Sequence, residues 1–124
     1  MEFDTKIAVV ICDDLELWQK LNVTAFLTSG IVSSVTGLIG EPSEDAGQQR
    51  YLPLIIQPMI IFASDAAALH RTRARAISRG VPLAVYIEDM FSSGHDGANR
   101  KTVLRYNGDE LALVGLSMRG ERKV

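Results

Sequence analysis

Carboxylates stand directly after two apolar stretches of this sequence, in positions where they could act in chemistry. Asp13 and Asp14 follow the run Lys6–Cys12, and Glu88 and Asp89 follow a later run of the same kind. If both runs are parallel strands, the four acids share the sheet edge at which α/β proteins hold their ligands. Such a cluster can bind a hard cation or raise the pKa of a member for acid–base work. The alternative is structural, with Asp14 capping a helix and the later pair exposed in a turn.

Asn22, His95 and Cys12 are further candidates, each with a structural alternative. Asn22 falls on the expected inward stripe of a helix, where it either bonds to a backbone turn or faces a polar cleft. Leaving its amide buried and unpaired would cost about 1–3 kcal/mol. His95 lies in a turn-rich stretch with Ser and Asp neighbours, but triad members come from separate elements. Cys12, within a strand and without a flanking base, is expected to be a small buried hydrophobe.

The element that must position most of these residues is a strand followed by a helix. Five consecutive apolar residues within Lys6–Cys12 are typical of a strand buried on both faces. A helix over Leu15–Ser29 is predicted next, ended by Gly30 in the left-handed conformation. This helix is apolar almost all round, so it requires a second cover, which a partner subunit can supply. Its predicted inward stripe consists of Trp18, Leu21, Asn22, Ala25 and Ser29.

The rest of the chain continues the alternation of strands and helices. Strands are predicted over 58–63, 81–87 and 111–118, and helices over 66–79 and 99–106. Ser64 or Asp65 is expected to cap the first of these helices, and Asn99 the second. The predicted inward residues of the first are Ala66, Leu69, Ala76 and Ile77. Residues 31–52, with their glycines and Pro42, predict a long surface loop that serves as a binding loop or a mobile flap. The outward Arg71, Arg75 and Arg79 indicate a solvated helix face rather than a phosphate-binding strip. The order predicts a single α/β domain over residues 1–124, a small three-layer sandwich with a four-stranded mixed sheet and helices on both faces.

Composition narrows the class of function. The 124 residues are 47% hydrophobic and 23% charged, as expected for one domain with its own core. A net charge of -2 makes nucleic acid an unexpected partner. No run approaches the roughly 18 apolar residues of a membrane span, and Met1–Lys6 lacks the order of a secretion signal, so a cytoplasmic protein is expected. No phosphate loop, paired-histidine motif or Cys/His cluster occurs, and no cofactor or metal is expected.

Several short motifs together resemble a known family. They are the Ile7–Val10 strand, a strand-end acid with Leu15, the segment Leu21–Ala25, Gly40 with its following Glu, and Leu113–Leu116. Over about residues 6–120 this set resembles the uncharacterised bacterial domain-of-unknown-function family number two thousand. That family is similar in fold to type-two peptidyl-tRNA hydrolases, which implies a four-stranded mixed sheet with helices on both faces and frequent dimers. The hydrolases place a lysine- and glycine-rich turn after an Asp-Leu pair. Asp14-Leu15 fits that pair, but the following five residues lack the glycines.

Two functions from different classes follow. The first is a small-ligand-binding domain whose cleft is lined by Asp14, Trp18, Asn22, Asp89 and the 31–50 loop. Trp18 would supply an apolar or stacking wall, Asn22 two-way hydrogen bonding, and the acids a polar or cationic contact. The second is a hydrolase related to peptidyl-tRNA hydrolase, acting on an ester or amide. There Asp89 would orient or activate a water, while Lys20 and Asn22 would stabilise the oxyanion. A homodimer is expected in either case.

Overall fold

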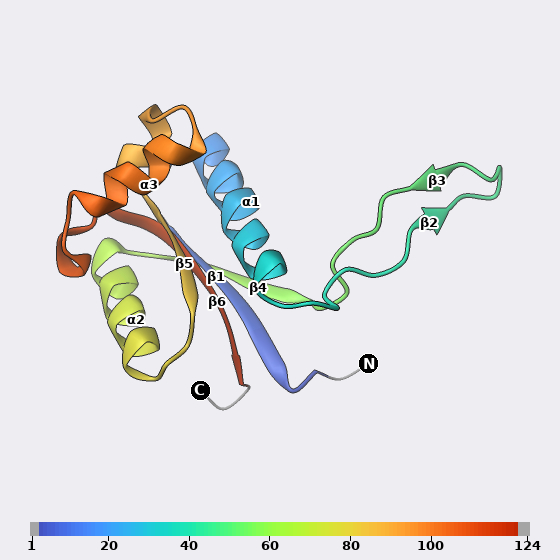
Figure 1. Ribbon diagram of the computed structural model, residues 1–124, viewed down its shortest axis with the longest axis horizontal. Coiled ribbons are helices and arrows are strands. Elements are labelled where there is room, and N and C mark those ends of the chain that lie inside the picture. Colours follow the sequence, from blue (N-terminus) through green and yellow to red (C-terminus); the bar gives the residue numbers. More distant parts are fainter. Residues whose placement is uncertain (1–2, 122–124) are drawn as a thin grey trace.

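The structure is a computed structural model of the chain, and it describes residues 3–121. Figure 1 shows a body made of a sheet with helices on both sides, and a long arm that stands away from it. Within residues 3–121, no helix is long and apolar enough to cross a membrane. The elements in chain order are β1 (Thr5–Cys12), α1 (Leu17–Ser34), β2 (Ser43–Glu44), β3 (Arg50–Tyr51), β4 (Met59–Ser64), α2 (Ala66–Ser78), β5 (Leu83–Ile87), η1 (Glu88–Ser92), α3 (Asp96–Leu104), η2 (Gly108–Glu110) and β6 (Leu113–Glu121).

The sheet has the strand order β4-β1-β6-β5. β1 pairs parallel with β4, whereas β6 is antiparallel to both of its neighbours, β1 and β5. β1, β4 and β5 therefore run in one direction, and their carboxyl ends lie at one edge of the sheet. α1 and α2 pack against the sheet from opposite sides, as Figure 1 shows. This arrangement confirms the predicted α/β class with a mixed sheet of four strands.

Helix α1 differs from its prediction at both ends. It begins after Glu16, which forms a capping box with Gln19, so Asp14 is not the cap. It continues through Gly30, which does not end the helix but lets it approach β5: a Cβ at this position would lie 3.0 Å from the Cβ of Ala84. The positive φ of 88° falls further on, at Gly37.

The inward face of α1 is also the opposite of the predicted stripe. Val23, Leu27 and Ile31 are buried against the sheet, whereas Trp18 and Leu21 are exposed. Because the helix is apolar on both sides, its spacing alone cannot choose which side faces the sheet. β6 determines which side of α1 packs on the sheet, because it presents a glycine and a serine to this helix.

α1 approaches β6 closely at Gly115 and Ser117. A Cβ on Gly115 would lie 2.7 Å from Cγ1 of Val23 and 2.9 Å from Cδ1 of Leu27. The buried hydroxyl of Ser117 donates a hydrogen bond of 2.9 Å to the carbonyl of Leu27. A helix carbonyl that already accepts a helical bond can accept a second, so this serine is satisfied in the core. These contacts fix α1 on the sheet.

Helix α2 covers the other face. Asp65 caps it by accepting a hydrogen bond of 2.8 Å from the backbone N–H of Ala68, as the sequence predicts. Leu69 and Ala76 are buried, which confirms half of the predicted inward face. The predicted inward residues Ala66 and Ile77 are instead exposed.

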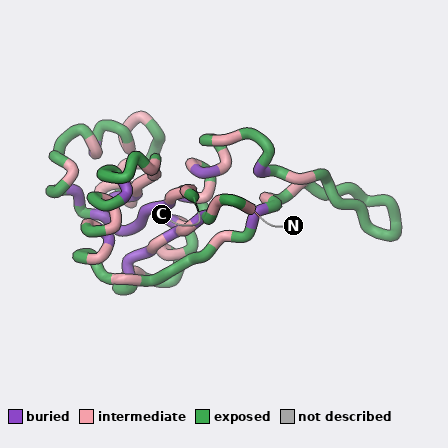
Figure 2. The backbone as a smooth tube through the Cα atoms, turned by 90° about the horizontal axis from the view of Figure 1, so that it is seen from below, coloured by how far each residue is buried: buried purple, intermediate pink, exposed green. Residues whose placement is uncertain are grey.

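Residues 31–52 were predicted to form one long surface loop, but the structure has the end of a helix in the first part and a hairpin in the rest. Residues 31–34 belong to α1, and residues 38–56 form a hairpin, called here the arm. Its base is held by hydrogen bonds between Gly40 and Leu54 (2.9 Å) and between Ile56 and Leu38 (2.8 Å). At its tip, the Asp45 carboxylate accepts bonds from the Tyr51 hydroxyl and two backbone N–H groups, which lower the pKa of Asp45. Figure 2 shows the arm exposed along nearly its whole length.

Candidate functional site

The carboxyl ends of the parallel strands bring the predicted acids to one edge of the sheet. Asp13 and Asp14 follow β1, and Glu88 and Asp89 open η1 directly after β5. Because β6 lies between β1 and β5, the two pairs are separated by one strand. The sequence therefore placed all four acids at the correct edge, but in two groups.

A hollow of about 620 Å³ opens at the β5 side of this edge, and it is called here the Asp89 pocket. Its walls come from η1, α3 and the first turn of α1. The lining residues are Gln19, Glu88, Asp89, Phe91, Ser92, Ser93, Ala98, Lys101, Thr102 and Arg105. Ligands of α/β proteins are held at this end of the strands, so the pocket lies where the fold predicts a site.

Opposite charges line the Asp89 pocket. Asp89 is oriented by the hydroxyl of Tyr106, which donates a hydrogen bond of 2.8 Å to its carboxylate. This bond and the negative charge of Asp89 raise the pKa of Tyr106, so the phenol stays protonated as a donor. Lys101 of α3 and Arg105, the C-cap of that helix, are four residues apart, which puts both cations on the side toward the pocket.

Gln19 joins the pocket from the opposite side. Its Oε1 accepts a hydrogen bond of 3.0 Å from the backbone N–H of Glu16 as part of the capping box. That bond orients the amide and leaves its two N–H groups as donors for a ligand. Sequence reasoning missed Gln19, Lys101 and Arg105. The i, i+3, i+4, i+7 spacing of residues 98, 101, 102 and 105 was the available signal for the α3 face.

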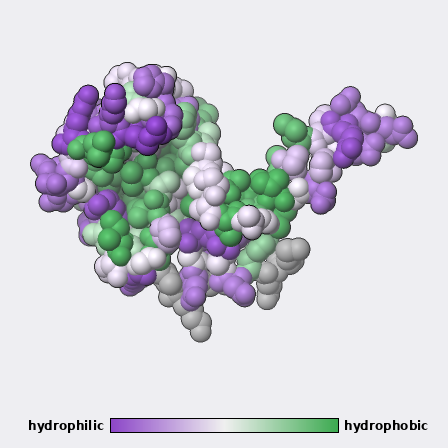
Figure 3. All heavy atoms as spheres, viewed as in Figure 1, coloured by the Kyte–Doolittle hydropathy of each residue, from purple (hydrophilic) through white to green (hydrophobic). Residues whose placement is uncertain are grey.

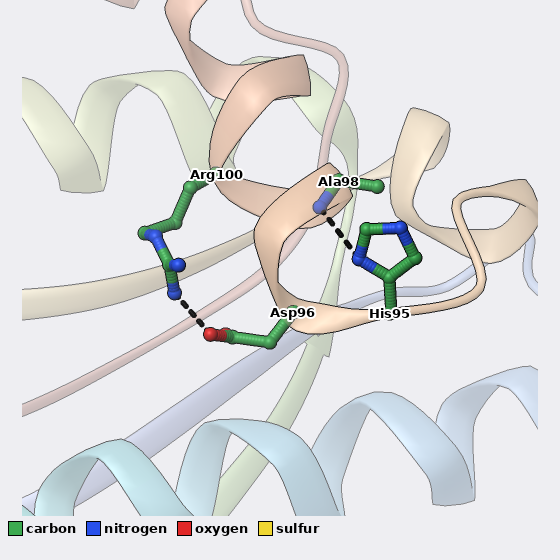
Figure 4. Close-up of polar contacts among 4 residues, drawn as sticks. All are labelled: His95, Asp96, Ala98 and Arg100. Carbon is green, nitrogen blue, oxygen red and sulfur yellow. Dashed lines mark hydrogen bonds and ion pairs between the residues drawn. The ribbon is translucent and has the colours of Figure 1, made fainter.

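His95 fixes the start of α3 and therefore the position of its cations. Its Nδ1 accepts a hydrogen bond of 3.1 Å from the backbone N–H of Ala98, and Asp96 forms an ion pair with Arg100 in the next turn (Figure 4). His95 is thus the N-cap of α3, and the predicted cap, Asn99, lies inside the helix. His95 was expected to lie in a flexible loop from which it could reach a site. In the structure it has a structural role instead.

A row of four aromatic rings runs from the pocket along α1 and β5. Trp18 packs edge-on against Phe91 with ring centroids 5.9 Å apart. Phe91 contacts Tyr86 at 5.3 Å, and Tyr86 contacts Phe26 at 5.6 Å. Phe91 lines the pocket, while Trp18 stands behind it and donates its indole N–H to Glu16 at 2.8 Å. Trp18 does not line the pocket itself and contacts its wall only through Phe91.

Asn22 lies beside the hydroxyl of Tyr86 rather than in the Asp89 pocket. Burial raises the pKa of Tyr86, and a hydrogen bond from Asn22 offsets part of this increase. The half-buried amide thus faces a tyrosine side chain. Lys20 and Asn22 are two residues apart on α1, so they point to nearly opposite sides of the helix. The structure does not bring Lys20, Asn22 and Asp89 together, and neither Lys20 nor Asn22 lines the pocket.

Asp14 belongs to a small cluster at the end of β1. Ligand atoms of Cys12, Asp13 and Asp14 lie within 4.8 Å of one another, and the thiol of Cys12 donates to Asp14 at 2.9 Å. Burial and this hydrogen bond raise the pKa of Cys12 above its ordinary value. A protonated thiol is a poor metal ligand and a poor nucleophile, so Cys12 acts as the small buried side chain that was predicted. The predicted 31–50 loop lies away from this edge and does not line either cluster.

Thiol labelling is expected to be slow in the folded protein. Because the pKa of Cys12 is raised, the fraction of thiolate at pH 8 is smaller than for an ordinary cysteine. A disulfide reagent at pH 8 should react slowly with native protein and at once after denaturation. Asp14→Asn removes the carboxylate that opposes ionisation, so labelling should become faster. A native thiol that reacts as fast as the denatured one would contradict the buried, protonated state.

The fold and the pocket define a class: a single small α/β domain with a ligand-sized hollow at the carboxyl ends of its parallel strands. Within that class, the chain belongs to the family described as protein of unknown function (DUF2000), whose model matches residues 5–124. The chain is also similar to the solved structure of a protein of unknown function from Agrobacterium tumefaciens. The two are 48% identical with a TM-score of 0.96, over 98% of this chain and 90% of the other. No curated protein matches the chain.

Proposed function

We propose that this protein binds a small molecule with both a positive and a negative group in the Asp89 pocket. Lys101 and Arg105 would hold a carboxylate or phosphate, and Asp89 would hold an amine. Phe91 would contact the apolar part of the ligand, and Gln19 would add a donor. A mostly concave site with a few oriented polar groups is the usual form of a small-molecule site.

The observation that carries this proposal is that the charges in the pocket are not paired with one another. Among residues 3–121 the only ion pair is that of Asp96 and Arg100, outside the pocket. Asp89 and the two α3 cations therefore face the same hollow without an ionic partner in the protein. A ligand of matching dipolar charge would satisfy both signs at once, which a purely anionic or cationic ligand does not.

Isothermal titration with free amino acids, their amides and their N-acetyl derivatives tests the proposal. A free amino acid should bind, and either derivative should bind more weakly because one of its two charges is gone. Asp89→Asn and Arg105→Ala should each weaken binding by about tenfold, the equivalent of one charge-assisted hydrogen bond of about 1.4 kcal/mol. Arg100→Ala, on the same helix but outside the pocket, is the matched control and should bind normally. Equal binding of the free and blocked forms would overturn the proposal.

A second candidate is a hydrolase related to type-two peptidyl-tRNA hydrolase that acts on an ester or amide. The mixed four-stranded sheet with helices on both faces supports this, as does a strand-end carboxylate oriented by Tyr106, which could position a water. In this version Lys20 and Asn22 would have to move to reach Asp89. Turnover of an N-blocked aminoacyl-tRNA that is lost in Asp89→Asn and Lys20→Ala would establish it, with an authentic hydrolase as control.

We also propose that the protein is a cytoplasmic homodimer. The support for a dimer is a large apolar surface that α1, β4 and the arm leave exposed.

A further inference from the structure

We infer that two copies of this chain join edge to edge through β4, with the arm of each copy laid on α1 of the other. This inference rests on the proposed homodimer and adds the surface that forms it. Four features of the chain carry it: an open strand edge, an excess of exposed surface, an apolar arm and a matching helix face.

The outer edge of β4 is open and uncharged. β4 pairs only with β1, so the backbone groups on its other side have no strand neighbour. Ile60, Ile61 and Phe62 are 47%, 53% and 51% exposed, which means that both faces of the strand are open as well. Edge strands of monomeric proteins usually carry a charge, a proline or a bulge that prevents pairing, and residues 59–64 contain none of these.

The opposite edge of the sheet differs. Beside β5 lies a groove that is mostly apolar and whose wall on α3 carries Asp96, Asn99 and Arg100. Charged side chains thus stand beside the β5 edge, whereas β4 itself carries none, so the two edges are not equivalent. The edge that invites pairing is the one at β4.

The chain exposes more surface than a compact monomer. Its accessible area is 8343 Å², whereas a compact monomer of 13.6 kDa exposes about 6,600 Å². The difference of roughly a quarter exceeds the roughly 800 Å² that each partner buries in a standard interface. A partner as large as the chain itself could therefore cover it.

The arm supplies much of this surface in an ordered form. Leu52, Leu54 and Ile56 alternate along an extended segment, so they project to the same side. Leu52 and Leu54 are 86% and 78% exposed. Figure 3 shows apolar residues gathered at the base of the arm and polar residues at its tip. An isolated hairpin is marginally stable in water, so this stripe requires a surface to rest on.

A second copy offers that surface through its own α1. Two identical strands related by a two-fold axis across their edges run antiparallel, so the start of one β4 meets the end of the other. The arm leads into the start of β4, and α1 begins at the sheet edge where β4 ends, because β1 and β4 are parallel. The arm of one copy would thus cross the partner's β4 toward the first turns of its α1, which packs on the neighbouring β1 and on β6 and exposes Leu17 and Leu21. Both halves of the contact belong to one chain, which is what a symmetric dimer requires.

Sedimentation equilibrium of the full chain over a range of concentrations tests this interface. The unmodified chain should sediment at roughly twice 13.6 kDa. Ile61→Lys places two like charges at the paired edges and should raise the dimer dissociation constant by at least roughly 100-fold. Leu52→Ser/Leu54→Ser, which changes only exposed arm residues, should also shift the protein toward monomer. Ile77→Lys, at a half-exposed position on α2 away from β4 and the arm, is the matched control and should remain dimeric.

The outcomes distinguish a wrong interface from a protein that does not form a dimer. A monomeric unmodified chain would overturn both the homodimer and its interface. A dimer that persists in the β4 and arm variants would keep the homodimer and overturn this surface. Circular dichroism melts show whether each variant folds. If Ile61→Lys does not fold, the arm variant still tests the interface, because its two substitutions lie outside the core. The ligand titration uses variants of the Asp89 pocket, so a failure to bind ligand leaves the sedimentation result unaffected.

Discussion

Leu69→Ala should lower the free energy of unfolding by about 3 kcal/mol, the usual cost of removing a buried leucine. Leu69 is completely buried on the inner side of α2, in the same core cluster as Leu116 of β6. Its removal would leave a cavity between helix and sheet that close-packed neighbours cannot fill. Equilibrium unfolding in urea gives the value, with an unchanged slope if the native fold is kept.

Ile77→Ala is the matched control on the same helix. Ile77 is 51% exposed, so its truncation removes an apolar group that is already half in water. The expected loss is under about 1 kcal/mol. Helical spacing in the sequence favoured Ile77 as an inward residue, so the pair of variants also tests which face of α2 packs on the sheet. Equal losses at both positions would show that the observed face is incorrect.

Gly115→Ala should destabilise the protein by about 2–3 kcal/mol, although it adds only one methyl group. The new Cβ would lie 2.7 Å from Val23 and 2.9 Å from Leu27, both of them buried. Neither side chain has free space to withdraw into, so α1 would have to move off β6. Because α1 also carries Gln19, the same variant should weaken ligand binding in the Asp89 pocket.

Gly97→Ala separates this steric effect from the general effect of replacing glycine. Gly97 lies near the start of α3, and its nearest contact for an added Cβ is 3.5 Å, at ordinary van der Waals distance. Alanine favours the helix over glycine by up to about 1 kcal/mol, so this variant should be neutral or more stable. Thermal melts of the two variants should therefore shift in opposite directions, and a shared destabilisation would contradict the tight approach of α1 to β6.

The sequence predicted the fold well where one signal was strong. The unbroken apolar run of β1 and the Asp65 cap of α2 depend on local residues, and both are confirmed. The face of α1 was predicted wrongly because Trp18 and Leu21 are as apolar as Val23 and Leu27. Gly115 of β6 decides which side of α1 faces the sheet. This glycine is almost a hundred residues away, so no local pattern contains it.

The candidate site was predicted in part for a similar reason. Asp89 was found because a strand end is visible in the sequence. Lys101 and Arg105 were missed because the packing of α3 on η1 decides which side of the helix faces a pocket, and no local pattern contains that packing. Lys20 and Asn22 were paired through the resemblance to the hydrolases, although positions two apart on a helix diverge.

The place of β6 between β1 and β5 has a consequence for the order of folding. Its pairing joins Thr5 to Glu121, contacts of very high sequence separation that slow the search for the native topology. During synthesis, β1, β4 and β5 leave the ribosome before β6, the strand that joins β5 to the β1–β4 pair, and β5 has no other sheet neighbour. The nascent chain therefore exposes unpaired apolar strand edges until β6 emerges, and in this interval it is most prone to aggregation.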